Sequence, residues 1–379
     1  MFRAVSHRSD MTARFVPARG MSPLPEPLQP RGRAATSNTP GRFERDTREP
    51  FDDGWGETDA APKQIRTTLI KDNSRTIIAT NDSPDISFNR SINPYRGCEH
   101  GCIYCYARPS HAYWGYSAGV DFESMLFFKP GAARLLEQQF RKPYYQVEPI
   151  VIGANTDAYQ PIERQLRLTR SILEVCLRFK HPVSLITKSA AITRDLDILS
   201  ELAALGLVKA AISLTTLDRK LARAMEPRAA TPKRRLEAME ALSKAGVPLT
   251  VMTAPIIPGL TDHEIEALLK ASANAGAQSA GYVLLRLPLE VRDLFHDWLR
   301  KVKPDAADKV INMVRDTRGG ADYSSEFHVR GRGQGPIADM IAKRFRVGVR
   351  RYGLEKDRVK LRCDLFERPL DTEDQLSLF

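Results

Sequence analysis

Short apolar runs alternate with amphipathic stretches through the middle of the chain, and this alternation predicts the fold. Five of the runs are bounded by turn residues, as expected of strands buried on both faces: residues 149–154, 183–187, 209–215, 248–254 and 280–287. Between them, apolar residues recur every three or four positions, which is typical of helices that cover a sheet. With one more strand before residue 98, we count about six βα units. We therefore expect an α/β fold, a partial (β/α)6 barrel of the TIM type, with functional groups at the carboxyl ends of its strands.

Local signals place some boundaries of this pattern. Gly206 and Gly246 follow amphipathic stretches, at positions where helices end, and Thr231-Pro232 is typical of a helix start. Ahead of the barrel, two strand-like runs at residues 67–70 and 75–80 flank a turn-forming segment. They predict a β-hairpin.

The two ends of the chain differ from its alternating middle. Residues 1–62 are rich in Arg, Pro and Ser without apolar periodicity, so we expect a disordered arm. An organelle transit peptide is the alternative, which the prolines and acidic residues disfavour. The barrel is expected over residues 63–302, followed by a basic extension at 303–363 and an acidic tail at 364–379.

Composition and charge narrow the class of protein. The 379 residues are 42% hydrophobic and 27% charged, which is a globular composition. No apolar run is long enough to span a membrane, and no secretory signal is evident, so we expect a cytoplasmic protein without a membrane partner. The net charge of +11 indicates an acidic partner, with nucleic acid as the first candidate.

Three of the five cysteines lie within eight positions: Cys98, Cys102 and Cys105. Thiols spaced C-x3-C-x2-C can converge from one tight loop, and in a reducing compartment they indicate metal or redox chemistry. Three cysteine ligands on a four-iron cluster would leave one iron open to a substrate. A zinc site completed by His100 or His111 is the main alternative, and a loop without metal is another.

The cysteine motif, with Tyr104 before its last cysteine, resembles that of the radical S-adenosylmethionine (SAM) superfamily. Within that superfamily, residues 85–300 resemble the spore photoproduct lyase-like branch. This branch includes proteins called DNA repair photolyases. The resemblance implies a [4Fe-4S] cluster on Cys98, Cys102 and Cys105, SAM as cofactor, and an electron donor such as flavodoxin or ferredoxin. It also implies lyase-like radical chemistry that begins with reductive cleavage of SAM.

The resemblance further implies which strand ends hold the cofactor. Asn155, Thr156 and Asp157 follow the first apolar run after the cysteines, and we expect them to face cofactor and substrate. The alternative is that Thr156 or Asp157 caps a helix. Lys188, at the end of the next run, is expected to pair with the methionyl carboxylate rather than to be an ordinary exposed lysine.

Two further residues extend this expected site. Ser213 places a hydroxyl in an otherwise apolar run, and the resemblance implies that it contacts the same carboxylate. A bond from Ser213 to neighbouring backbone is the alternative. Arg228 belongs to an acidic-Pro-Arg segment and is expected either to clamp a carboxylate or to brace Glu226.

One part of the family pattern is missing. Spore photoproduct lyases carry a hydrogen-donating cysteine on the strand after the cluster, whereas residues 152–157 here contain none. Tyr104 and Tyr106 match the tyrosines associated with that hydrogen relay. Cys363 is a replacement donor only if the C-terminal region folds over the barrel mouth. We therefore do not expect thymine spore photoproduct itself to be the substrate.

The C-terminal extension carries clustered cations, among them Arg344, Arg346, Arg350 and Arg351. Cations interleaved with aromatic residues can neutralise phosphates and stack on bases, so we expect contact with nucleic acid. A solvated helix face is the alternative.

The last five residues, Gln375-Leu376-Ser377-Leu378-Phe379, resemble the pentapeptide by which bacterial repair proteins dock on the sliding clamp. Gln375 would form hydrogen bonds while Leu376, Leu378 and Phe379 fill an apolar pocket. A chance apolar terminus is the alternative.

Together these features predict a radical SAM enzyme that abstracts hydrogen during repair or modification of DNA or another nucleic acid. Radical modification of a protein or small molecule is one alternative. A non-catalytic iron–sulfur adaptor bound to DNA or the clamp is another.

Overall fold

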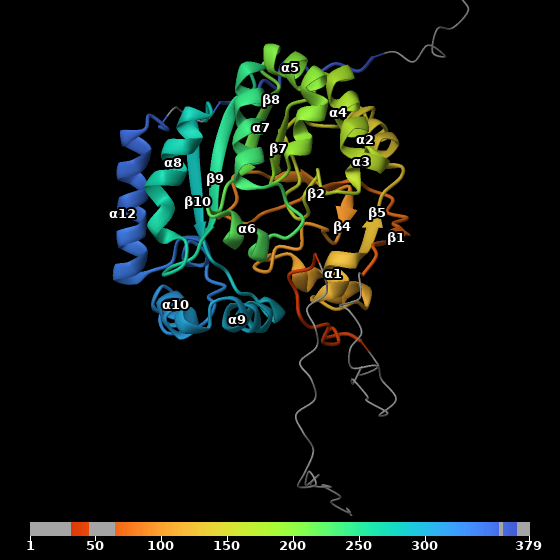
Figure 1. The fold of residues 1–379 in the computed structure, drawn as a ribbon. Coiled ribbons are helices and arrows are strands. Elements are labelled where there is room, and N and C mark those ends of the chain that lie inside the picture. Colours follow the sequence, from red (N-terminus) through yellow and green to blue (C-terminus); the bar gives the residue numbers. More distant parts are fainter. Residues whose placement is uncertain (1–31, 45–64, 356–358, 370–379) are drawn as a thin grey trace, which may run out of the picture.

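The computed structural model describes residues 32–44, 65–355 and 359–369, and its centre is a seven-stranded sheet (Figure 1). The strand order is β10-β9-β8-β7-β6-β3-β2. All neighbours are parallel except β2 and β3, so six strands run in one direction. This arrangement confirms the predicted partial barrel. The strand bounds are β2 Ile78–Thr80, β3 Arg90–Ile92, β6 Ile150–Ile152, β7 Val183–Thr187, β8 Val208–Ser213, β9 Leu249–Ile256 and β10 Ser279–Leu284.

Helices cover the outside of this sheet, as Figure 1 shows for α4, α5, α7 and α8. Their starts and ends follow the local signals: Thr231 accepts a hydrogen bond from the Arg234 N–H at the start of α7, and Gly206 and Gly246 adopt positive φ beyond α5 and α7. The apolar residues of these helices and of the strands form one large buried cluster. The bounds are α2 Ala132–Phe140, α4 Leu168–Arg178, α5 Leu196–Ala204, α7 Pro232–Lys244 and α8 Ile265–Asn274.

The inner face of the sheet carries polar side chains, whereas the outer face packs into the apolar cluster. Val183 and Leu185 of β7 pack into the outer cluster, so the alternation of the strand directs Ser184 and Lys188 to the opposite face. The same alternation in β8 directs Ser213 inward. Ser184 and Ser213 thus lie on the inner face, and Lys188 directly follows the carboxyl end of β7.

A second, three-stranded sheet supports the cysteine loop. Here β5 (Met125–Phe128) lies between β1 (Thr68–Lys71), to which it is parallel, and β4 (Tyr95–Arg96), to which it is antiparallel. The predicted hairpin of the two early strands is therefore wrong, because β1 pairs with β5 and β2 with β3. The turn between them is instead closed by the Asp72 carboxylate, which accepts from the Ser74 N–H at 2.9 Å and binds Arg96 at 2.8 Å.

Part of the predicted N-terminal arm packs beside helix α1 (Val120–Ser124), which precedes β5 of this sheet. Ala34 and Ala35 are fully buried, and their N–H groups donate to the Glu123 carboxylate of α1. Residues 32–44 thus depart from the predicted disorder, since backbone bonding to a buried carboxylate needs no apolar periodicity. The rest of residues 1–62 lies outside the described ranges.

The C-terminal extension is continuous with the fold. Val310 and Ile311 of α10 share a buried cluster with Phe295 and Trp298 of α9, and α12 packs on the outer side of α8 (Figure 1). No helix in the described part of the chain has the length and apolarity needed to cross a membrane. The bounds are α9 Glu290–Val302, α10 Ala307–Asp316, α11 Val329–Arg332 and α12 Gly335–Arg351.

Candidate active site

The cysteine loop follows β4 and lies against the carboxyl ends of the barrel strands. Its Ile103 N–H donates to the Met225 carbonyl, beyond β8, at 3.0 Å. Its Glu99 N–H donates to the Gln160 side chain, beyond β6, at 2.8 Å. Cys98 and Cys102 are buried, and Cys105 is partly exposed. The thiols therefore lie where a parallel sheet of this kind places its functional groups.

Two glycines allow the tight path of this loop. Gly97 and Gly101 adopt φ values of 74° and 65°, a region that glycine tolerates. A Cβ on Gly97 would lie 2.8 Å from the Leu126 side chain, and one on Gly101 would lie 2.7 Å from the Glu123 carboxylate. Both positions thus require glycine, in agreement with the sequence.

A buried arginine holds the loop in shape. Arg108 donates to the carbonyls of Gly101 and Cys102 and forms an ion pair with Glu123 at 2.6 Å, with both side chains fully buried. The same guanidinium donates to the carbonyls of Ala118 and Gly119 at 3.0 Å. One side chain therefore joins the cysteine loop, the segment before α1 and, through Glu123, the N-terminal residues 34 and 35.

The donor set fits an iron–sulfur cluster. Burial, together with Asp157 and the other two thiols, raises the pKa of Cys98 well above its usual range, and burial raises that of Cys102 to about 12. Free thiols in such a place stay protonated, and a bound metal cluster would bind them as thiolates. Within the described residues, no three Cys, His, Asp or Glu side chains are grouped to hold a single metal ion.

The two histidines considered for a zinc site have other partners. His100 lies with its Nδ1 at 3.2 Å from the Asp157 carboxylate. The ring of His111 packs edge-on against Phe122 and Phe127, and burial lowers its pKa to about 4. The His100 ring is thus directed toward a protein carboxylate, and the His111 ring is packed among aromatic side chains.

The ends of β6 and β7 are joined by Asp157. Its carboxylate accepts from the Thr187 hydroxyl at 2.6 Å and the Lys188 N–H at 2.7 Å, besides contacting His100. Burial alone would raise the pKa of Asp157, but the His100 ring and these hydrogen bonds lower it below its usual range. The carboxylate is thus used to brace strand ends against the cysteine loop.

The two residues before Asp157 differ in exposure. Thr156 is buried and donates its hydroxyl to the Tyr95 carbonyl at 2.9 Å, so its side chain has a structural partner. Asn155 is exposed, and its N–H donates to the Asn93 side chain at 2.9 Å. Of the three residues expected here to face the cofactor, Asn155 alone keeps a side chain without a hydrogen bond in the described part of the chain.

A second buried network lies beneath the loop. Tyr104 donates its hydroxyl to the Glu226 carboxylate, which also accepts from Thr215 and forms a buried ion pair with Arg235. Burial would raise the pKa of Glu226, but Arg235 and Lys188 lower it. Arg235 was not anticipated from the sequence, because one arginine on a charged helix gives no sign that it points inward.

Lys188 directly follows β7, and Ser213 is the last residue of the neighbouring strand β8, where Thr187 lies opposite Ile212. The Lys188 charge acts on the Cys102 thiol. The Lys188 ammonium lies 5.9 Å from the centre of the Tyr104 ring and has no ion-pair partner among the described residues. Burial opposes its charge, but Cys102 in its thiolate form and the Glu226 carboxylate raise the pKa of Lys188. Ser213 is a buried residue, and its hydroxyl forms no hydrogen bond within the described chain. Both groups are free to bind a ligand.

Arg228 clamps a carboxylate, which is one of its two expected roles, and that carboxylate belongs to Glu99 of the chain itself. Its guanidinium lies 2.8 Å from the buried Glu99 carboxylate, which also accepts from Thr67 at 2.6 Å and from the Ile162 N–H at 2.7 Å. Bracing of Glu226 by Arg228 is therefore wrong, because Arg235 occupies that place. Arg228 instead anchors the cysteine loop through the residue after Cys98.

The two tyrosines of the expected hydrogen relay point into different surroundings. Tyr104 is buried against Glu226, whereas Tyr106 is 48% exposed and donates to the Ala154 carbonyl beyond β6. The Arg286 guanidinium, beyond β10, lies 5.4 Å from the centre of the Tyr106 ring. Tyr106 therefore borders the open end of the barrel, and Tyr104 its interior.

Cys363 is far from this site. The Arg362 N–H donates to the Gly206 carbonyl at 3.1 Å and the Glu367 N–H to the Phe179 carbonyl at 3.2 Å. Gly206 precedes β8 and Phe179 precedes β7, so this segment lies at the amino ends of the strands (Figure 1). The expectation that Cys363 replaces the missing donor is wrong, because the segment does not fold over the mouth.

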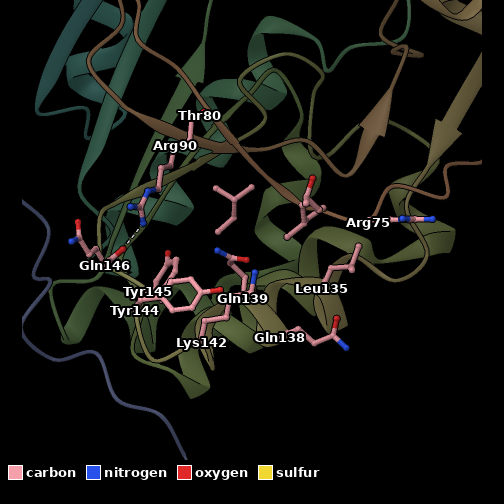
Figure 2. A pocket seen from close by; sticks show the side chains of 13 residues that line it. Arg75, Thr80, Arg90, Leu135, Gln138, Gln139, Lys142, Tyr144, Tyr145 and Gln146 are labelled. Carbon is pink, nitrogen blue, oxygen red and sulfur yellow. Dashed lines mark hydrogen bonds between the residues drawn. The ribbon is translucent and has the colours of Figure 1, made fainter.

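A cavity of about 580 Å³ lies outside this site, beside the edge strand β2 and helix α2 (Figure 2). Its lining includes Arg75, Arg90, Lys142, Tyr144 and Tyr145, and no cysteine or acidic residue. It is a cationic surface hollow, separate from the three thiols.

The four arginines expected to bind nucleic acid lie on α12 but differ in their partners. Arg344 forms an ion pair with Glu266 at 2.6 Å, and Arg350 with Glu355 at 3.2 Å. Arg346 and Arg351 are exposed without an ion pair in the described part. The tail residues Gln375, Leu376, Leu378 and Phe379 lie outside the described ranges.

Comparison with known proteins agrees with this geometry. Residues 92–271 match the family described as the radical SAM superfamily. An uncharacterised protein of Mycobacterium tuberculosis strain H37Rv is 34% identical over 232 residues, which are 61% of this chain and 68% of that protein. One from Methanocaldococcus jannaschii is 28% identical over 173 residues, covering 46% and 62% of the two chains.

The fold matches a solved one. Spore photoproduct lyase complexed with dinucleoside spore photoproduct aligns with a TM-score of 0.52 at 17% identity, covering 75% of this chain and 78% of that one. A tyrosine-to-phenylalanine variant of that lyase aligns with a TM-score of 0.54 at 14% identity, covering 76% and 80%. These likenesses show a shared fold.

Proposed function

The chain belongs to the radical SAM superfamily, whose enzymes use a [4Fe-4S] cluster and SAM, and from this premise we propose that it abstracts hydrogen from a nucleic acid during repair or modification. In this proposal Cys98, Cys102 and Cys105 hold the cluster. The observation that carries it is the placement of three thiols beside the unpaired Lys188 and Ser213 at adjoining strand ends.

When bound by Cys98, Cys102 and Cys105, the cluster would supply the reductive cleavage of SAM that generates a hydrogen-abstracting radical, using one electron from a donor such as reduced flavodoxin or ferredoxin. The chain's own residues bind SAM and orient it. The Lys188 ammonium and the Ser213 hydroxyl bind the methionyl carboxylate through charge-assisted hydrogen bonds. The Tyr104 ring limits the positions of Lys188, and Glu226 with Arg235 holds Tyr104 in place.

The remaining site residues support this arrangement. Asp157 and Thr156 brace the end of β6, Arg228 anchors the loop through Glu99, and Asn155 offers a side chain to cofactor or substrate. Burial of Cys98, Cys102 and Tyr104 excludes water from the reacting groups. A non-catalytic adaptor would have no use for an unpaired Lys188 next to the cluster.

Three features support a nucleic-acid substrate. The net charge is +11, Arg346 and Arg351 are exposed and unpaired in the described chain, and the shared fold includes a lyase complexed with a dinucleoside photoproduct. Because residues 152–157 lack a cysteine, we propose a substrate other than spore photoproduct, with Tyr106 at the mouth as a hydrogen-relay candidate. Such a protein would act in the cytoplasm.

We expect DNA binding to weaken at least tenfold between about 50 and 200 mM salt, because phosphate contacts release counterions. Replacing Arg346 and Arg351 together by Gln should lower the affinity and flatten this dependence. The measurement is fluorescence anisotropy with a labelled DNA duplex. The matched control replaces the exposed Arg223 and Arg300 by Gln and should bind as the unmodified protein does. An affinity independent of salt would contradict a nucleic-acid substrate.

We also propose that the tail docks on the bacterial sliding clamp through Gln375, Leu376, Leu378 and Phe379. A peptide of the last ten residues should bind the clamp in calorimetry, weakly, because a few apolar anchors carry such contacts. Replacing Leu378 and Phe379 by Ala should abolish the binding. Absence of binding by the natural peptide would refute this proposal and leave the enzymatic one untouched.

A further inference from the structure

Two arginines meet where the last strand of the barrel ends. Arg286 follows β10, and Arg318 lies in the connection between α10 and α11. Arg318 is 3% exposed and donates to the Leu285 carbonyl, directly before Arg286, and to the Val329 carbonyl, both at 2.8 Å. Arg318 thus attaches the basic extension to the end of β10. Through this attachment the Arg318 guanidinium lies near Arg286 at the mouth of the barrel.

Neither guanidinium has an acidic partner. Within the described chain, no carboxylate lies at ion-pair distance from Arg286 or Arg318. The Nε atom of each is buried and makes no hydrogen bond. Burial, and then the charge of Arg286, lowers the pKa of Arg318 to about 10. Arg286 is half-buried, and the terminal nitrogens of Arg318 already donate to carbonyls, so the Nε groups are the unsatisfied donors. Two neighbouring like charges repel each other, and an anion beside them would offset that repulsion.

The arginine pair lies beside the reaction centre. The Arg286 guanidinium is 5.4 Å from the centre of the Tyr106 ring, and Tyr106 directly follows Cys105. Because the Tyr106 hydroxyl donates to the Ala154 carbonyl beyond β6, these residues reach across the mouth from β6 toward β10. A ligand held by the pair would therefore be next to the cysteine loop and on its more exposed side.

We propose that Arg286 and Arg318 form the binding site for a phosphate group of the substrate, with the Tyr106 ring beside it to contact the adjoining nucleobase. Guanidinium groups offer paired N–H donors that match phosphate oxygens, and exposed aromatic rings stack on bases. This inference rests on the proposed function and specifies it: the substrate is held by a phosphodiester near the reacting nucleotide. Lys188 and Ser213, deeper in the site, remain available for the cofactor.

The test compares DNA binding by the cluster-loaded full chain, measured anaerobically by anisotropy with a labelled single-stranded 12-mer. Arg286→Gln should weaken binding about tenfold, as expected for hydrogen bonds to a charged group. It should also reduce the slope of log affinity against log salt by about 0.7, the value for one phosphate contact on a single strand. Arg286→Lys should keep the charge and lose part of the affinity. Iron content should be unchanged in both variants.

The control is Arg75→Gln, which removes an exposed cation from the cavity beside β2 (Figure 2). It should bind the 12-mer as the unmodified protein does. If Arg75→Gln loses as much affinity as Arg286→Gln, DNA responds to overall charge or to that cavity, and the proposal is overturned. It is also overturned if Arg286→Gln binds with unchanged affinity and salt slope.

A second probe separates this proposal from the proposed function. Inorganic phosphate should raise the thermal unfolding temperature of the unmodified protein relative to chloride at equal ionic strength, and Arg286→Gln should abolish the shift. If no DNA binds but this phosphate effect depends on Arg286, nucleic acid is the wrong substrate and the phosphate site stands. If phosphate has no effect and DNA does not bind, the phosphate site is refuted.

Discussion

Replacing Cys102 by Ala should remove the iron–sulfur cluster and reduce 5′-deoxyadenosine formation to background. Cys102 is one of three thiols on a loop whose path is set by Gly97, Gly101 and Arg108. In the described chain no other thiol can take its place, since Cys176 is buried on α4 and Cys363 lies at the opposite ends of the strands. The measurements are iron and sulfide per chain after anaerobic reconstitution, and nucleoside product by chromatography.

The matched control for that variant is Cys363→Ala. It also removes one thiol. We expect full iron content and full product formation, because the segment that contains Cys363 does not reach the mouth of the barrel. A Cys102→Ala protein with a complete four-iron cluster and normal product formation would refute the assignment of the three ligands. Equal losses in both variants would point to general instability.

Replacing Arg108 by Met should cost about 3–5 kcal/mol of unfolding free energy, the usual penalty for leaving a buried charge without its partner. Glu123 would lose its ion pair at 2.6 Å while remaining fully buried, and the carbonyls of Gly101 and Cys102 would lose their donor. The loop would then hold its thiols less firmly. We expect a lower midpoint in chemical denaturation and faster loss of iron to a chelator.

Two companion variants make this prediction specific. Arg300→Met changes an exposed arginine of α9 without an ion pair in the described chain, and should alter stability by less than about 0.5 kcal/mol. Adding Glu123→Gln to Arg108→Met should recover part of the loss, because the unpaired charge is then gone. An Arg108→Met protein as stable as the Arg300→Met protein would show that the buried pair does not stabilise the loop.

Features that depend on periodicity were predictable from the sequence. The apolar run at 183–187 is β7, and the run at 209–215 overlaps β8, Val208–Ser213. Parallel strands bring their carboxyl ends together, so Lys188 and Ser213 were expected in one site, and the structure places them at the adjoining ends of β7 and β8.

Features that depend on distant partners were not predictable. Arg108, Arg235 and Glu99 are charged residues that would be expected at the surface from the sequence alone, yet each is buried in an ion pair with a residue of another segment. Arg228 was wrongly paired with Glu226 because the two are close in sequence. Cys363 was wrongly considered as a hydrogen donor at the mouth of the barrel, because no local sequence pattern indicates where a C-terminal segment packs.

The prediction of a hairpin at residues 67–80 was wrong for a related reason. Two strand-like runs around a turn suit a hairpin locally, but β1 pairs with β5, which follows the cysteine loop, and β2 pairs with β3. Strand pairing of this kind depends on packing with neighbours rather than on the turn.

The most direct test of the central claim is 5′-deoxyadenosine formation by the unmodified protein. The reconstituted chain would be incubated anaerobically with dithionite and SAM, with and without DNA, and the nucleoside quantified by chromatography. We expect product from the unmodified protein, more of it when DNA carrying a substrate is present, and none above background from Cys102→Ala. No product from a protein with a complete cluster, in either condition, would contradict the claim that this site cleaves SAM.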